Sequence, residues 1–214
     1  MSILDFTPVI PVVVPDANLP SRQALAAAAR EAHQRQLTTA KRGVMSMRLP
    51  KSDQFLITSF GSSFEDLGSG YTCLIDATGT LLQGNTGLEL PPETRYHLQS
   101  YAVRADICAI AHLYPSHVSA YARQGKVFDL VTDTARRVIK EVLRVQCSEC
   151  ISRFCGLCSC RTDIRRSYTG VNVLLLRDDG MVTLGTSLED ALNLAHLAEE
   201  TARESFGTFE ELRN

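Results

Sequence analysis

Three short segments of this chain carry side chains that could do acid–base or metal chemistry. Glu93 and His97 lie about one helical turn apart, and His112 and Tyr114 follow some fifteen residues further on. Asp179 comes later, inside an Asp-Asp-Gly sequence. Carboxylate, imidazole and phenol groups can each move a proton, and each can also hold a divalent metal. If folding brings the three segments together, they form a candidate catalytic site.

Each of these residues also has a purely structural explanation. His112 could be a hydrogen-bonded histidine at the end of a strand, and Glu93 could be a first-turn charge that favours the helix dipole. Asp179 precedes a glycine, which is ordinary chemistry for a hairpin turn. His117 is a further imidazole that could replace a lost ligand, but it could equally cap a helix or face solvent. The residue types alone leave these alternatives open.

The bulk composition is that of an ordinary folded protein. The chain has 214 residues, of which 44% are hydrophobic and 21% charged, and its formal net charge is -2. This balance suggests neither a nucleic acid nor an anionic membrane as partner. No apolar run reaches the roughly 18 residues of a membrane span, and the start lacks the basic stretch of a signal peptide. We therefore expect a cytoplasmic protein.

Five of the seven cysteines lie between Cys147 and Cys160. Cys147 and Cys150 form one Cys-x2-Cys pair, and Cys155 and Cys158 form a second. Four thiolates in two such pairs suit a tetrahedral structural zinc, although the gap of four residues between the pairs is tight. An iron–sulfur cluster is possible by ligand count, but the spacing matches neither common ferredoxin run. The other alternative is a thiol-rich insertion that stays reduced in the cell.

Cys73 and Cys108 lie outside this cluster, on two predicted apolar strands. Unpaired cysteine usually behaves as a small apolar side chain. We therefore expect both thiols in the core.

The rest of the chain predicts strands and helices that alternate after a proline-rich start. Residues 1–20 contain four prolines, each of which fixes φ and removes a donor, so they should form an extended N-terminal arm. Helices are predicted over residues 21–36, 92–103, 116–123, 133–145 and 187–206. Strands are predicted over residues 43–48, 54–59, 71–75, 108–113, 171–176 and 181–184, the first three as a meander and the last two as a hairpin. This order predicts one layered α/β domain over residues 21–214, with a cysteine-rich insertion at 147–160.

From about residue 37 to residue 206, the order and spacing of several segments resemble the class II aldolase/adducin family. The matching segments are residues 43–48, 57–67, 93–101, 104–107 leading to Ala111-His112, 174–180 and 185–191. The resemblance implies a three-layer α/β/α sandwich with a mostly antiparallel central sheet. It also implies a homo-oligomer, commonly a tetramer with sites between subunits.

In catalytic members of that family, three imidazoles hold a divalent metal, usually zinc, and a carboxylate moves the proton. By resemblance, Glu93 falls at the catalytic carboxylate, His97 matches a histidine common in its helix, and His112 falls at one metal ligand. Tyr114 and Asp179 stand where the other two imidazoles would be. They could still ligate a metal through oxygen, which would give a harder and weaker site. Zinc is the expected metal if one binds, and metal-free acid–base catalysis by Glu93, Tyr114 and Asp179 is the alternative.

The phosphate-binding segments of the family are altered as well. The family's Gly-Asn-x-Ser reads Gly-Val-Met-Ser at residues 43–46, and its Ser-Ser-Glu reads Pro91-Pro92-Glu93. Prolines have no amide with which to bind a phosphate. The sequence thus favours a diverged class II aldolase-like enzyme, of lyase, dehydratase or cyclase type, acting on a small, non-phosphorylated carbonyl or hydroxy compound. The alternative is a non-catalytic, adducin-like scaffold or self-association module with a decayed site.

Overall fold

The computed structural model describes residues 16–39, 41–139, 142–145, 170–177 and 179–211. Most of the predicted arm and the whole cysteine cluster lie outside these residues. The strands are β1 (Val44–Arg48), β2 (Gln54–Thr58), β3 (Thr72–Asp76), β4 (Leu81–Gln83), β5 (Ala109–Leu113), β6 (Val142–Val145), β7 (Val173–Leu176) and β8 (Gly180–Gly185). The helices are α1 (Leu19–Gln34), the 3-10 turn η1 (Ser69–Tyr71), α2 (Thr94–Val103), α3 (Ser116–Arg123), α4 (Asp133–Val138) and α7 (Leu188–Glu211).

These strands form one sheet in the order β4-β3-β2-β1-β5-β8-β7-β6. Neighbours pair antiparallel throughout, except that β6 and β7 are parallel. The predicted meander is confirmed, because β1, β2 and β3 are consecutive neighbours, and the predicted hairpin is β7–β8. The mixed α/β fold with a mostly antiparallel sheet is therefore as expected.

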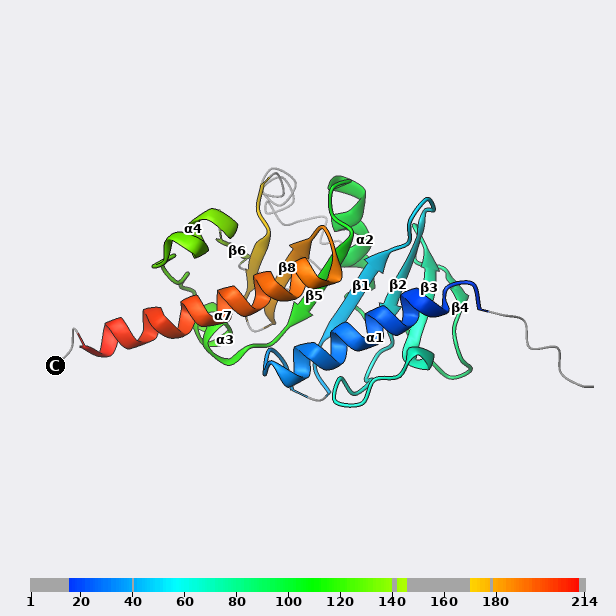
Figure 1. The fold of residues 1–214 in the computed structure, drawn as a ribbon, viewed down its shortest axis with the longest axis horizontal. Coiled ribbons are helices and arrows are strands. Elements are labelled where there is room, and N and C mark those ends of the chain that lie inside the picture. The colour runs from blue at the N-terminus through cyan, green and yellow to red at the C-terminus, as the bar shows by residue number, and fades with distance from the viewer. Residues whose placement is uncertain (1–15, 40, 140–141, 146–169, 178, 212–214) are drawn as a thin grey trace, which may run out of the picture.

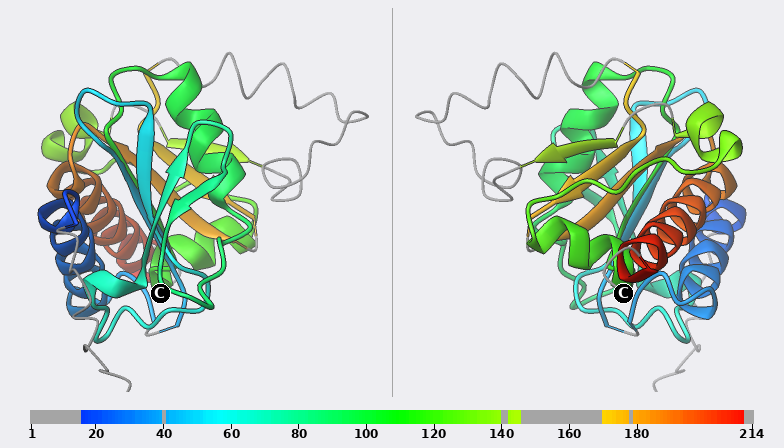
Figure 2. Two further views of the ribbon diagram at one scale, coloured as in Figure 1. Left: turned by 90° about the vertical axis from the view of Figure 1, so that its right-hand side faces the viewer. Right: turned by 90° about the vertical axis from the view of Figure 1, so that its left-hand side faces the viewer.

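Helices cover both faces of the sheet. Figure 2 shows α1 and α7 against one face and α2 against the other. Side chains alternate along each strand, so Ala109, Ala111 and Leu113 of β5 pack in the core under α1 and α7. Ile110 packs in the second core, with Tyr96 and Tyr101 of α2. His112 therefore lies on the α2 face, and this placement decides what surrounds it.

Local signals in the sequence explain where the two long helices begin. The predicted first helix begins two residues earlier than expected, at Leu19, with Pro20 in its first turn, where a missing amide costs nothing. At the start of α7 the Ser187 hydroxyl accepts the amide of Asp190 at 3.0 Å, which confirms the predicted cap. No helix among the residues described is both long and apolar enough to cross a membrane.

Two predictions about local structure were wrong. The helix expected over residues 133–145 ends at Val138, and the chain then pairs with β7 as strand β6. The apolar residues have helical spacing, but such spacing is a weak signal over so short a stretch. Backbone pairing with β7 decided the structure of residues 142–145 instead. Cys73 is buried as expected, but Cys108 is exposed, because it precedes β5 at the end of the sheet and only its backbone is paired.

Candidate active site

His112 lies near the end of β5, beside the turn that connects β7 to β8. Figure 1 shows β5 and β8, the two paired strands, side by side. Nε2 of His112 is 2.7 Å from the backbone oxygen of Asp179. A carbonyl oxygen can only accept, so Nε2 must carry the proton and donate it. The lone pair is then on Nδ1, which is buried without a hydrogen-bond partner. Only 2% of the surface of His112 is exposed, so protein groups and not solvent surround its ring.

Tyr114 and Asp179 meet directly at the same place. The Tyr114 hydroxyl donates to Oδ1 of Asp179 at 2.8 Å, and its ring stacks on His112 with 5.3 Å between centroids. Burial and, after it, the negative charge of Asp179 raise the pKa of Tyr114, and the Glu93 carboxylate adds to the shift. The Arg42 guanidinium, 4.0 Å above the phenol ring, opposes them. Tyr114 is thus a neutral donor.

Gly180 makes the close approach of Asp179 to β5 possible. Its φ is +75°, and a Cβ added there would lie 2.3 Å from the backbone oxygen of Leu113. Any side chain would both strain the backbone and push the turn away from β5. The Asp-Gly sequence, predicted only as a good turn, therefore has a second role in placing the Asp179 groups against His112.

Glu93 approaches the site from α2. Glu93 is the residue immediately before α2, whereas the structural explanation, a charge that favours the helix dipole, placed it in the first turn. The backbone oxygen of Pro91 accepts hydrogen bonds from both the amide and the hydroxyl of Thr94, at 3.0 and 2.6 Å. These two bonds fix how the chain enters the helix. Oε2 of Glu93 is buried without a hydrogen-bond partner. Its carboxylate lies near enough to raise the pKa of Tyr114.

His97 links the site to a buried polar row. Its Nδ1 is 2.7 Å from the Ser46 hydroxyl, which is 2.8 Å from the Tyr101 hydroxyl. Burial, and then the neighbouring His112, lower the pKa of His97 to about 3, so it is neutral at ordinary pH. Burial also raises the pKa of Tyr101. Nε2 of His97 is buried without a hydrogen-bond partner.

The structure adds residues that sequence reasoning missed. Tyr101 lies four residues after His97, on the same face of α2, so helical spacing could have connected the two. Ser46 was noted only as part of an altered phosphate-binding segment. Arg42 lies in the loop before β1, and no pattern in the sequence predicted that its guanidinium lies over the Tyr114 ring.

His117 does not join this site. Its Nδ1 is 2.8 Å from Oε1 of Glu199 on α7. The same carboxylate accepts the backbone amides of His117 and Val118, each at 3.0 Å, and so caps the start of α3. The expectation that His117 caps a helix or faces solvent fits this arrangement better than a ligand role.

The altered phosphate-binding segments remain poor in donors once folded. Val44 buries its side chain in the core under α2 and pairs with His112 across the sheet. Pro91 is buried and Pro92 is exposed, and neither has an amide to offer. The folded segments give no support to phosphate binding.

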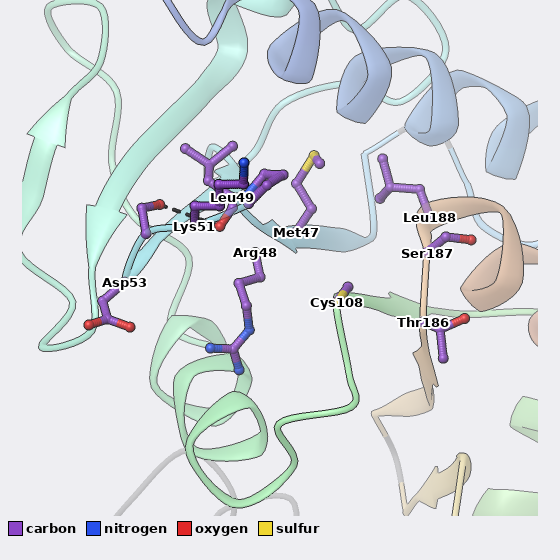
Figure 3. Close-up of a pocket in the computed structure, with 11 residues that line it drawn as sticks. Met47, Arg48, Leu49, Lys51, Asp53, Cys108, Thr186, Ser187 and Leu188 are labelled. Carbon is purple, nitrogen blue, oxygen red and sulfur yellow. Dashed lines mark hydrogen bonds between the residues drawn. The ribbon is translucent and has the colours of Figure 1, made fainter.

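A large cavity lies away from these residues. It has a volume of about 770 Å³ and adjoins the opposite ends of β1 and β5 (Figure 3). Its lining residues are Met47 to Asp53, Cys108 and Thr186 to Leu188. None of the predicted site residues lines it.

The residues present do not fit a zinc centre of three imidazoles. Nε2 of His112 carries a proton, and the Tyr114 phenol is neutral and bonded to Asp179. Among the residues placed in the structure, no three His, Cys, Asp or Glu side chains are grouped to hold a metal. The predicted zinc at Cys147, Cys150, Cys155 and Cys158 falls outside those residues and stays a prediction.

A mostly antiparallel sheet between helical layers, with carboxylate, imidazole and phenol groups at the end of a central strand, defines a class II aldolase-like fold. The match to a family model is extensive. The chain belongs to the Class II Aldolase and Adducin N-terminal domain family, whose model matches residues 23–206.

Relatives in sequence and in structure agree with this assignment. L-fuculose phosphate aldolase of Methanococcus vannielii is 27% identical over 160 residues, which are 74% of this chain and 81% of that protein. An aldolase II superfamily protein from Pseudomonas syringae superposes with a TM-score of 0.75 at 23% identity, covering 92% of this chain and 79% of that one. A sugar-phosphate aldolase from Thermotoga maritima gives 0.74 at 19% identity, covering 91% and 97%. At these identities the structural likeness supports the fold alone.

Proposed function

We propose that this chain is a metal-independent, class II aldolase-like enzyme that acts on a small, non-phosphorylated carbonyl or hydroxy compound. The reaction is of lyase, dehydratase or cyclase type and proceeds by acid–base catalysis. One observation carries the proposal. Tyr114 and His112 both donate to Asp179, at 2.8 and 2.7 Å, so the groups at the family's ligand positions bond to one another.

Glu93 is the base in this proposal. Its Oε2 is buried and has no hydrogen-bond partner, so it is ready to accept a proton from a ligand that enters the site. The Tyr114 hydroxyl of the same site is a donor. Glu93 and Tyr114 can therefore act as an acid–base pair on one substrate.

Tyr114 is the acid or the hydrogen-bond donor to a substrate oxygen. Its raised pKa keeps the proton on the phenol. The hydroxyl has a single proton, which it donates to Asp179 in the structure, so a substrate oxygen must take the place of Asp179 as its acceptor. Arg42, stacked on the outer face of the ring, adds a positive charge that favours a substrate oxygen carrying negative charge. His112 supports the arrangement by fixing the backbone of Asp179.

The same geometry also supports a second candidate, the non-catalytic scaffold. Groups that satisfy one another's hydrogen bonds are what a site no longer used for ligands would retain. A small-molecule screen separates the two functions. Carbonyl and hydroxy compounds are tested by thermal shift against the wild type, Glu93→Gln and the exposed control Glu65→Gln, with and without EDTA.

We expect a compound that stabilises the wild type and Glu65→Gln but fails to stabilise Glu93→Gln. Its stabilising effect should be the same with and without EDTA. A screen in which no compound depends on Glu93 would favour the scaffold. Dependence on Glu93 together with loss of binding in EDTA would overturn the metal-independent part of the proposal.

We also propose that the chain forms a homo-oligomer, as the family resemblance implies, and sedimentation velocity tests this.

A further inference from the structure

Three buried polar atoms of the candidate active site have no hydrogen-bond partner among the described residues. They are Oε2 of Glu93, Nε2 of His97 and Nδ1 of His112. His97 is only 1% exposed and His112 only 2% exposed. Buried polar groups in folded proteins are nearly always bonded, because it is costly to leave one unbonded. Three such atoms in one site therefore indicate a ligand that bonds them.

The three side chains are neighbours on the face of the sheet that α2 covers. Glu93 and His97 are one helical turn apart, and the amide of His97 donates to the backbone oxygen of Glu93 at 3.1 Å. The His97 ring reaches the sheet at Ser46, whose hydroxyl is 2.7 Å from Nδ1. In the register of β1 with β5, Ser46 is the diagonal neighbour of His112 on the same face. In keeping with this position, His112 adds to the lowering of the His97 pKa that burial causes.

The hydrogen bonds of His97 decide which of its nitrogens carries the proton. The buried Tyr101 phenol is 2.8 Å from the Ser46 hydroxyl, and no other acceptor for its proton is found in the described part of the chain. When Tyr101 donates to Ser46, the Ser46 hydroxyl has one proton to give, and it gives this proton to Nδ1 of His97. A neutral imidazole that accepts at Nδ1 has its own proton on Nε2. The opposite direction would leave the phenol proton without an acceptor.

The two free ring nitrogens therefore differ in kind. Nε2 of His97 is a donor, whereas Nδ1 of His112 is an acceptor, because Nε2 of His112 donates to the backbone oxygen of Asp179. A donor beside an acceptor matches a hydroxyl group, which accepts through its oxygen and donates its proton. A carbonyl oxygen could bond His97 but has no proton for His112.

We propose that His97 and His112 bind a hydroxyl group of the substrate, and that Tyr101 and Ser46 are positioning residues that keep the His97 proton on Nε2. This hydroxyl site rests on the proposed function, in which Glu93 is the base. It narrows the substrate to compounds that carry a hydroxyl group beside that base. It also gives His97, which the acid–base pair does not use, a role in specificity.

Nitrogen-15 NMR of the histidine rings tests where the protons are. The chain has only five histidines, so His→Gln variants assign every ring. We expect His97 and His112 each to carry the proton on Nε2. Tyr101→Phe removes the donor to Ser46 and should move part of the His97 proton to Nδ1. Tyr71→Phe, at a residue 55% exposed, is the matched control and should change nothing.

Binding of two probe compounds tests the hydroxyl site itself. Lactamide and propionamide are both neutral amides and differ by one hydroxyl group. We expect the wild type to bind lactamide roughly tenfold more tightly than propionamide, a factor that one net hydrogen bond can supply. His97→Phe should remove this preference, whereas His196→Phe, at an exposed position of α7, should keep it. If circular dichroism shows that His97→Phe does not fold, the preference should still fall in Tyr101→Phe.

Three results would overturn the hydroxyl site. They are equal binding of lactamide and propionamide, binding of neither compound, and a His97 ring protonated on Nδ1 in the wild type. Glu93→Gln separates this failure from failure of the proposed function. Equal binding of both compounds that is lost in Glu93→Gln would reject the hydroxyl site and keep Glu93 as the base. A preference for lactamide that persists in Glu93→Gln would support the hydroxyl site and count against the base.

Discussion

The hydroxyl of Tyr114 donates to the carboxylate of Asp179 across 2.8 Å, from the end of β5 to the turn before β8. These residues are 65 positions apart in the sequence and stand at two positions where the family resemblance places metal-binding imidazoles. Their bond changes what the site can do. A phenol and a carboxylate joined in this way hold and move a proton, and they leave fewer lone pairs for a cation.

Asp179→Asn should lower the pKa of Tyr114 toward its ordinary value. The neighbouring carboxylate charge disfavours the phenolate, so neutralising it makes ionisation easier. Ultraviolet titration isolates Tyr114 as the difference between each protein and its Tyr114→Phe counterpart. The exposed Asp66→Asn variant should leave the midpoint unchanged. An Asp179→Asn midpoint equal to that of the wild type would show that the two groups do not interact as described.

His97→Gln should flatten the acid side of the stability profile. The folded pKa of His97, about 3, lies below the ordinary 6.5, so the unfolded chain takes up the proton first as pH falls. The stability from neutral His97 is therefore complete above pH 6.5 and is lost as pH falls toward 3, at a slope of at most about 1.4 kcal/mol per pH unit. Urea unfolding across this range measures the slope.

His196→Gln is the matched control for that experiment. His196 lies on α7 with nearly half of its side chain exposed, beside Glu200. Its removal should leave the slope between pH 6.5 and 3 unchanged. Equal slopes in the wild type and His97→Gln would mean that His97 is not held neutral in the folded protein.

Gly180→Ala should be strongly destabilising. The residue has a φ of +75°, and the new methyl group would lie 2.3 Å from the Leu113 backbone oxygen. We expect a loss of about 3 kcal/mol or more in the free energy of unfolding. Gly87→Ala is the control, since φ there is +86° but no atom lies within 4 Å, and it should cost only about 1 kcal/mol. Similar losses in both variants would argue against the close packing of the turn on β5.

Any zinc bound by the purified protein should depend on the cysteines and not on His112. Because Nε2 of His112 and the Tyr114 hydroxyl both donate to Asp179, the three positions where the family resemblance places imidazoles are bonded to one another. Elemental analysis should give the same zinc content for His112→Ala as for the wild type. Zinc that persists in Cys147→Ser/Cys150→Ser and disappears in His112→Ala would reverse this expectation.

Much of the fold follows from local patterns in the sequence. The alanine-rich stretch, the Ser187 cap and the Asp-Gly turn act over a few residues, and α1, α7 and the β7–β8 hairpin follow them closely. Residues 133–145 show where this fails. Their apolar spacing suits a helix, but the strand β7 that pairs with the second half comes some thirty residues later. Short-range patterns carry no information about such a partner.

For the site, the sequence by itself determined which groups are available: Glu93 and His112 in matched positions, with Tyr114 and Asp179 in place of imidazoles. Only the tertiary structure decided how those groups are used. Antiparallel pairing of β5 with β8 brings the turn beside His112, and the positive φ of Gly180 lets the turn approach closely enough to form both bonds to Asp179. Protonation and hydrogen bonding depend on distances between atoms, and those distances exist only after strands distant in the chain have paired.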